Sequence, residues 1–303
     1  MASFFDEIAR NGMKSALLFF VFFVFFAFVI MIFAFFLGTS VLGGLIIGAV
    51  IVAIYAIIAY FMGGKMVLKI SKAQKADPGQ YHYLYDIVEG LSSATQVKMP
   101  EVYIINDPNP NAFATGRNRN HAYIAVTTGL LSMMDKRELQ GVIAHELSHV
   151  ADNDILYMLV AVAFAGAIGM VAAIIRNSVF FMGVPMGGNR RNGNGTIIVI
   201  IALIIGLLAP LFALLLRLAI SRRREYMADA NGSRLTRDPH SLASALSKIR
   251  DYTKNPQARP VMHANDITAS LYFSNPLRAN GVTNLFSTHP PIDERINRLE
   301  HMY

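Results

Sequence analysis

The sequence contains no cysteine and no tryptophan, and only 16% of its 303 residues are charged. Without cysteine, the chain cannot form disulfides, a thiolate metal site or a cysteine nucleophile. An average soluble domain is about 25% charged, so this charge content argues against both a disordered chain and an ordinary soluble enzyme. Hydrophobic residues make up 54% of the chain, with 20 phenylalanines, and the mean hydropathy is +0.41. This composition favours a membrane protein.

Four uncharged apolar segments, each 21 to 23 residues long, account for the missing charge. They are residues 15–37, 41–62, 155–175 and 196–216. A helix needs about 20 apolar residues to cross the hydrocarbon core of a bilayer. We therefore expect a multi-pass helical membrane protein with about four transmembrane helices, as hairpins over residues 1–62 and 155–220. The second pair is richer in alanine and glycine, so packing against protein or partial insertion stays open for it.

Lysine and arginine near the ends of transmembrane helices mark the cytoplasmic side. Basic residues follow the second and the fourth segment: Lys65, Lys69, Lys72 and Lys75, then Arg217, Arg222, Arg223 and Arg224. This pattern predicts a cell-membrane protein whose termini and polar regions, 63–154 and 221–303, are cytoplasmic. The loop 176–195 would then face outward, although it carries three arginines and no acidic residue. We attribute the net charge of +7 to basic residues that set the membrane topology and attract anionic lipid, because no nucleic-acid motif accompanies it.

The two polar regions together are long enough to bury a core. Apolar spacing and turn residues predict a helix over residues 81–97, a strand over 102–105, an extended segment over 111–116 and a strand over 121–131. We therefore expect a small antiparallel sheet within an α+β domain. Asp135, with Glu138 three residues later, has the form of a capping box at the start of the next helix.

That next helix carries the sequence His145-Glu146-Leu147-Ser148-His149. Residues four apart share a helix face, so both imidazoles can bind one metal ion. Glu146 lies beside them and can reach a water molecule on that metal. Two surface histidines are the alternative, but apolar residues flank the motif on both sides, and a half-buried histidine pair needs partners. The motif therefore predicts a zinc site.

A catalytic zinc keeps three protein ligands and one open position, and without cysteine the third ligand is a histidine, aspartate or glutamate. The candidates are Glu225, Asp229, His240, His263 and His289. Glu225 and Asp229 stand out because their spacing places two acids on one helix face. One of them can bind the metal while the other bonds a ligand imidazole. A simple salt bridge from the preceding arginines to Glu225 is the alternative.

Four blocks of the chain, in this order, resemble the HtpX membrane zinc metalloproteases, which are relatives of the CAAX prenyl proteases. The blocks are residues 111–116, 145–149, 221–229 and 287–291. The apolar hairpins fall in the gaps between them, so the resemblance covers nearly the whole chain. It implies a zincin-like (gluzincin) catalytic domain split between residues 63–154 and 221–303, with one zinc ion per chain.

The resemblance also implies roles for individual residues. His145, His149 and Glu225 would bind zinc, Glu146 would be catalytic, and Asp229 would orient a zinc-bound histidine. His289 is similar to a residue that contacts the reacting carbonyl. The edge strand that holds the substrate would include Asn111, Ala112, Phe113 and Ala114.

These observations predict a zinc endopeptidase that cuts misfolded or damaged membrane proteins at the cytoplasmic face, as part of protein quality control under stress. Its partners would be polypeptide substrates and the lipid bilayer, without nucleic acid, and the sequence does not set the oligomeric state. A prenyl-protein peptidase is an alternative within the same reaction class. A zinc-stabilised scaffold is a non-enzymatic alternative, but it gives no role to Glu146 and lacks a fourth protein ligand.

Overall fold

The computed structural model describes scattered positions between Met13 and Met31, and residues 40–181, 222–254, 271–273 and 290–302. The expected fourth apolar segment at 196–216 and residues 182–195 of the expected loop lie outside the described residues, as does His289.

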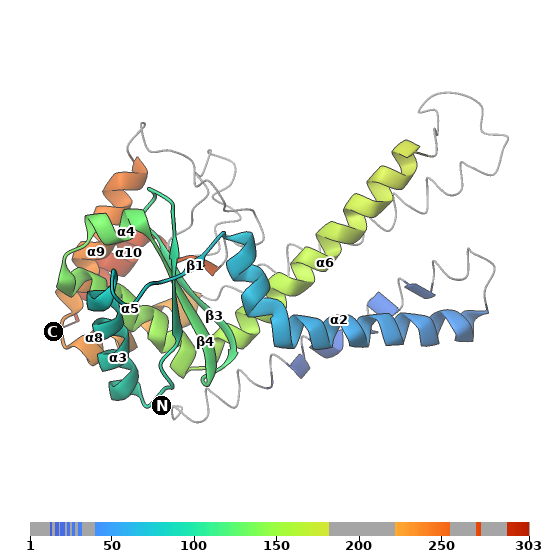
Figure 1. The fold of residues 1–303 in the computed structure, drawn as a ribbon, viewed down its shortest axis with the longest axis horizontal. Coiled ribbons are helices and arrows are strands. Elements are labelled where there is room, and N and C mark those ends of the chain that lie inside the picture. The colour runs from blue at the N-terminus through green and yellow to red at the C-terminus, as the bar shows by residue number, and fades with distance from the viewer. Residues whose placement is uncertain are drawn as a thin grey trace.

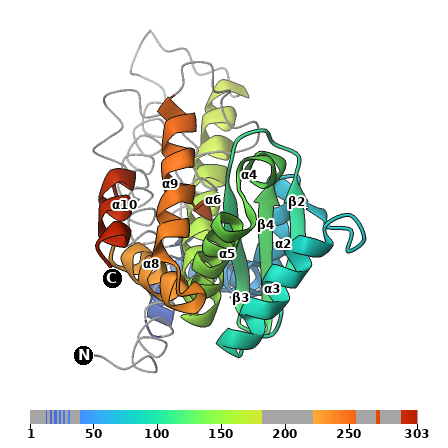
Figure 2. The ribbon, with the colours of Figure 1, turned by 90° about the vertical axis from the view of Figure 1, so that its left-hand side faces the viewer.

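A small sheet and several helices form one body, and two long helices extend from it on the same side (Figure 1). The long helices are α2 and α6, and α8, α9 and α10 group beyond α5 on one side of the sheet (Figure 2). The described elements are α2 Val41–Ile70, β1 Gln74–Lys75, α3 His82–Thr95, β2 Glu101–Ile105, β3 Ala112–Asn118, β4 His121–Thr127, α4 Thr128–Met133, α5 Lys136–Ala151, α6 Asp154–Phe181, α8 Arg222–Thr236, α9 Pro239–Lys254 and α10 Ile292–Glu300.

Side chains of the sheet alternate between two faces, as the pleat of a strand requires, and both faces are buried. Ala114 and Ile124 belong to the core that the sheet shares with α3, α5 and α9. Phe113 and Ala125 point the other way, into a second core with α2 and α6. The sheet therefore separates the helices of the body from the two long helices.

The sheet is mixed, which corrects the expected antiparallel sheet. Its strand order is β1–β2–β4–β3, and β2 pairs with β4 in parallel while the other two pairs are antiparallel. The reason lies in the connection after β2, where Pro108 and Pro110 have no backbone N–H for a hairpin ladder. Asp107 instead turns the chain by accepting a hydrogen bond from the Asn109 backbone N–H at 2.9 Å. The chain thus reaches the far edge of the sheet as β3, and β4 returns into the gap.

The strand expected over residues 121–131 is also too long. It ends at Thr127, and the short helix α4 follows. The Thr127 hydroxyl accepts from the backbone N–H of Leu130 at 3.2 Å and donates to the carbonyl of Asn109 at 2.7 Å. One side chain therefore caps the helix and fixes the preceding loop.

Helix α5 begins with the capping box that the sequence predicts. The Asp135 carboxylate accepts from the backbone N–H groups of residues 137 and 138, and the Glu138 carboxylate accepts from the backbone N–H of Asp135. Glu138 is buried and also pairs with Lys248 of α9 at 2.6 Å. Helix α5 ends at Ala151, and α6 leaves at an angle of 82° after Asn153, whose φ of 59° is left-handed.

Among the described helices, α2 is long and apolar enough to cross a membrane on its own, over Leu42–Ile70. It runs eight residues beyond the expected end at Met62. Its Gly48 lies close to Ala27 of the first apolar segment, because a Cβ there would meet the Ala27 carbonyl at 3.1 Å.

The third apolar segment forms most of α6, which starts at Asp154. The first half of α6 is enclosed by protein: Ile155, Leu159 and Phe164 are all fully buried. Helices α5 and α6 are long and apolar enough to cross a membrane only if the two, bent by 82°, form one span. The described residues therefore support one or two candidate spans, where the sequence predicts about four.

Candidate metal centre

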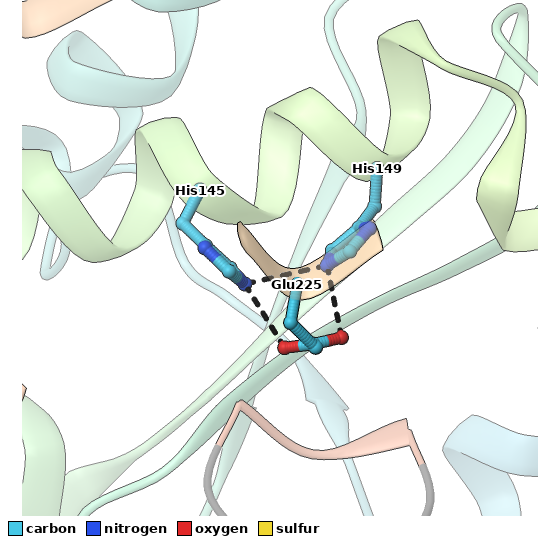
Figure 3. Close-up of side chains that lie close together, drawn as sticks. All are labelled: His145, His149 and Glu225. Carbon is cyan, nitrogen blue, oxygen red and sulfur yellow. Dashed lines mark hydrogen bonds and ion pairs between the residues drawn. The ribbon is translucent and has the colours of Figure 1, made fainter. Parts of the chain in front are cut away.

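His145 and His149 point from one face of α5 toward Glu225 of α8 (Figure 3). The two histidine Nε2 atoms are 3.3 Å apart. The Glu225 carboxylate oxygens lie 3.7 Å from them, Oε2 near His145 and Oε1 near His149. All three side chains are buried. The helical spacing thus brings the two histidines together, and the fold adds a carboxylate from residues 76 positions further along the chain.

This donor set fits a tetrahedral cation. Ligand bonds of about 2.0–2.2 Å at tetrahedral angles place donor atoms about 3.3–3.5 Å apart, close to the separations of 3.3 and 3.7 Å observed here. Two imidazole nitrogens and one carboxylate are ligands that zinc accepts. Three protein donors also leave a fourth position open.

On the His145 side, the Asp229 Oδ1 atom lies 2.9 Å from His145 Nδ1. This contact directs the Nε2 lone pair toward the other donors. Arg295 of α10 donates two hydrogen bonds to the same carboxylate, from Nε to Oδ2 at 2.8 Å and from Nη2 to Oδ1 at 2.7 Å. All three side chains are buried. The sequence singled out Asp229 but assigned no role to Arg295, which reaches this carboxylate from 66 residues further along the chain.

On the His149 side, the Asp154 Oδ2 atom lies 3.2 Å from His149 Nδ1. The other oxygen of Asp154 lies 4.0 Å from Arg224 Nε, and the Arg224 guanidinium stacks over the Tyr157 ring at 4.5 Å. Sequence reasoning missed Asp154, because it lies beyond the end of α5 and no helical spacing places it near His149. The signal in the sequence that could have identified Asp154 is its position, since it is an acidic residue directly before the apolar segment 155–175.

Glu225 and Asp229 reach the histidines because α8 packs tightly on α5. Gly232 lies two turns after Glu225 on the same face of α8. A Cβ at Gly232 would meet the His145 backbone nitrogen at 2.9 Å and its Cα at 3.1 Å. The close approach of the two helices therefore requires glycine at this position.

Comparisons with known proteins support the same reading. Residues 78–303 match peptidase family M48. The chain belongs to this family. With the donor set above, membership makes it a metalloendopeptidase.

Three relatives named "Protease HtpX homolog" match this M48 peptidase over nearly their whole length. That of Caldanaerobacter subterraneus subsp. tengcongensis is 43% identical over 300 residues, covering 98% of this chain and 97% of the relative. That of Tropheryma whipplei is 40% identical, with 98% of each chain covered. That of Streptococcus gordonii is 40% identical, covering 98% and 99%. The resemblance to HtpX proteases inferred from the four blocks is confirmed.

A solved structure shares the fold of this M48 peptidase. The crystal structure of S. mikatae Ste24p superposes with a TM-score of 0.51 at 19% identity. The match covers 97% of this chain and 66% of that chain. At this identity the likeness concerns the fold alone.

Glu146 is buried beside the donor triad of this M48 peptidase. Burial raises the pKa of its carboxyl to about 7, against the lowering effect of the charge on His149 and of the hydrogen bond from the Ala114 backbone N–H. A carboxyl with a pKa near neutrality can both accept and donate a proton at the pH of a cell.

The pKa values of the other titratable groups at the M48 site shift in different directions. Burial lowers the pKa of His145 more than Asp229 raises it. Burial also lowers the pKa of His149, but the bonded Asp154 and the nearby Glu225 outweigh it and raise that pKa. For Asp229, the Arg295 guanidinium and the bond to His145 outweigh burial and hold the pKa below its usual value. The Asp229–Arg295 pair is therefore charged when the site forms.

Asn111, Ala112, Phe113 and Ala114 run into the edge strand of the M48 peptidase sheet. The Asn111 carbonyl faces β4, where it accepts from the Thr127 backbone N–H at 3.0 Å. Ala112 faces outward, and its carbonyl accepts from the Phe273 backbone N–H at 2.8 Å. The Phe273 ring packs on His145, with centroids 4.9 Å apart. This outer edge therefore runs past the metal centre.

Of the remaining histidines weighed as third ligands, His240 lies exposed on α9 and does not join the triad. His263 and His289 lie outside the described residues.

Proposed function

We propose that this protein is a zinc-dependent membrane endopeptidase in which His145, His149 and Glu225 bind the metal ion. The observation that carries the proposal is the convergence of these three buried donors on one point, with tetrahedral separations and one position left open. An open fourth position is typical of catalytic zinc sites, whereas structural sites use four protein ligands.

When bound, zinc is a Lewis acid that polarises a carbonyl and lowers the pKa of water. Glu146 accepts the proton of the attacking water and then donates it to the leaving amine of the cut peptide bond. The raised pKa of its carboxyl, about 7, suits both steps. Asp229 and Asp154 hold the imidazoles in the orientation that presents Nε2 to the metal.

The substrate is proposed to add to the outer edge of β3 as an extended strand. The position of β3 at the edge of the sheet, beside the metal centre, supports this placement. Because pairing through backbone groups depends little on the side chains of the substrate, we expect broad substrate specificity. His289 is proposed to contact the reacting carbonyl, as the resemblance to the HtpX proteases implies.

The chain is proposed to cross the cell membrane several times, with residues 63–154 and 221–303 as one cytoplasmic peptidase domain. The exposed apolar surface of α2 and the lysines in its last turns and just after it support this orientation. A single cysteine introduced at Lys254 tests it, since the chain has no other cysteine. A membrane-impermeant maleimide should label it only after the membrane is opened.

Misfolded or damaged membrane proteins are the proposed substrates, because a peptidase site beside apolar helices meets membrane proteins first. The decisive experiment compares the detergent-purified protein with Glu146→Gln, which keeps the volume and all three metal ligands but cannot take the proton. We expect about one zinc per chain in both, and casein cleavage lower by about 10²–10⁴ in the variant.

Near-normal cleavage by Glu146→Gln would contradict the role of Glu146, and wild-type protein without zinc would contradict the metal assignment. A prenylated peptide assayed beside an unmodified unfolded protein separates the prenyl-peptidase alternative. Preference for the prenylated peptide would contradict the proposed substrates.

A further inference from the structure

A cavity lies where the last turns of α2 meet the β3–β4 hairpin, and it shares no residue with the metal centre. It has a volume of about 130 Å³. Its lining includes Tyr60, Phe61, Lys65, Arg117, His121 and Tyr123. Two cationic side chains, one histidine and three aromatic rings therefore surround one small space.

The charge of this cavity is positive and is not cancelled nearby. Within the part of the chain that the structure describes, no salt bridge forms to Lys65 or Arg117. The acid that faces the cavity wall is Glu101 of β2, opposite Tyr123 in the strand register, but it pairs with Lys75 at 3.4 Å. The cavity thus offers two cations to an anion.

Arg117 is held in place by aromatic rings. Its guanidinium carbon lies 4.9 Å from the centroid of the Phe61 ring and 5.9 Å from that of Tyr60. Such stacking covers the flat face of a guanidinium and leaves its N–H edge free to donate. That edge binds the oxygens of phosphate or carboxylate groups in pairs.

Two glycines keep the walls of the cavity close together. A Cβ at Gly64 of α2 would meet the Tyr123 ring at 3.0 Å. Gly116 of β3 has a φ of 146°, and a Cβ there would lie 2.3 Å from the His121 carbonyl. The helix and the hairpin are therefore fixed relative to each other, and the cavity between them is preformed.

The position of the cavity along α2 matches the surface of a bilayer. Exposed apolar side chains occur along α2 from Leu42 to Ile70. The uncharged part of this surface, from Leu42 to Met62, is about 31 Å long at 1.5 Å per residue. This equals the hydrocarbon thickness of a bilayer, about 30 Å. Lys65 is the first charge that follows. Tyr60, Phe61 and Lys65 thus lie where the aromatic and cationic belts of membrane proteins occur.

We propose that this cavity binds a phosphate group, and that its source is the headgroup of an anionic phospholipid. The two cations select a headgroup with net negative charge over a zwitterionic one. The inference rests on the proposed membrane placement of α2 but not on the peptidase chemistry.

The experiment measures lipid retention by the full chain. The protein is reconstituted in vesicles of equal parts phosphatidylglycerol and phosphatidylcholine and extracted in mild detergent, and retained lipid is counted by native mass spectrometry. We expect phosphatidylglycerol to be retained preferentially. One basic residue at an anionic surface corresponds to about a fivefold change in binding, so Arg117→Gln and Lys65→Gln should each lower the preference about fivefold. Lys98→Gln, an exposed lysine away from the cavity, should leave it unchanged.

Equal retention of the two lipids, or unchanged retention in both cavity variants, would overturn the proposal. A parallel arm adds inorganic phosphate at millimolar concentration during extraction. If inorganic phosphate displaces phosphatidylglycerol, the cavity binds free phosphate, and the assignment of the ligand to a lipid headgroup is wrong. Flotation with vesicles of pure phosphatidylcholine checks the membrane placement of α2 separately, and no arm depends on proteolysis.

Discussion

The two histidines of the metal centre are supported in unequal ways. His145 contacts Asp229 at 2.9 Å, and Arg295 holds that carboxylate through two bonds of 2.7 and 2.8 Å. His149 contacts Asp154 Oδ2 at 3.2 Å, and the other oxygen of that carboxylate lies 4.0 Å from Arg224 Nε. The His145 side belongs to the packed body, whereas the His149 side lies at the bend where α6 begins.

This difference suggests how the centre is built. A buried carboxylate that is bound by a buried guanidinium is fixed before any metal arrives, so His145 is preorganised. Asp154 sits at the first residue of α6, and any displacement of α6 relative to α5 moves it. The metal centre therefore has a rigid side toward the body and a more adjustable side toward the long helices.

The largest expected effect comes from the ligand that both sides share. Glu225→Ala removes one of three protein bonds to the metal, so zinc affinity should fall by more than the roughly 100-fold upper range for residues that only support a ligand. Affinity is measured on the chelator-stripped protein by competition with a zinc indicator. An affinity within tenfold of wild type would mean that another residue is the third ligand.

The next effect tests the rigid side. Asp229→Asn keeps the volume, but an amide has one acceptor oxygen where the carboxylate has two. It therefore cannot accept the contact from His145 together with both hydrogen bonds from Arg295, and it leaves the buried Arg295 charge without its anionic partner. We expect zinc affinity to fall by about 100-fold, the upper end for such residues. If Asp229→Asn binds zinc more weakly than Glu225→Ala, the two acids exchange their roles.

A third prediction concerns the helix contact that carries both acids. Gly232→Ala should push α8 away from α5, because its Cβ would meet the His145 backbone at 2.9 Å and backbone atoms cannot give way. Overpacking of this kind costs about 1–3 kcal/mol, so the melting temperature in detergent and the zinc affinity should both fall.

The matched control for that variant is Gly90→Ala. Gly90 lies on the exposed surface of α3, and its Cβ would meet nothing within 4 Å. It should show no loss of zinc affinity and a small gain in stability, about 1 kcal/mol, from the better helix propensity of alanine. A melting temperature that falls equally in both variants would contradict the role of the α5–α8 contact.

Local rules predicted the parts of this site that lie within one helix. The four-residue spacing of His145 and His149, and that of Glu225 and Asp229, follow from helix geometry alone. The capping box at Asp135 follows from a three-residue pattern. Each of these needs no knowledge of what the helix packs against, and each is present in the structure.

The features that the sequence did not predict depend on how distant segments of the chain pack together. The parallel pairing of β2 with β4 depends on where β3 enters the sheet, which neither strand encodes. Arg295 reaches Asp229 from 66 residues away. Asp154 reaches His149 because the chain turns by 82° between α5 and α6. The role of His289 stays a prediction.

The smallest expected effect tests the adjustable side. Asp154→Asn keeps an oxygen that can accept from His149 Nδ1, and the Arg224 guanidinium retains its stacking on Tyr157. Zinc affinity should therefore fall by about tenfold, the lower end for residues that orient a ligand. Asp152→Asn is the matched control, since that buried carboxylate accepts from the Asn231 side chain at 3.2 Å instead of facing a histidine. A loss in Asp154→Asn equal to that in Asp229→Asn would mean that the two sides are equally rigid, whereas an affinity equal to that of Asp152→Asn would mean that Asp154 does not support His149.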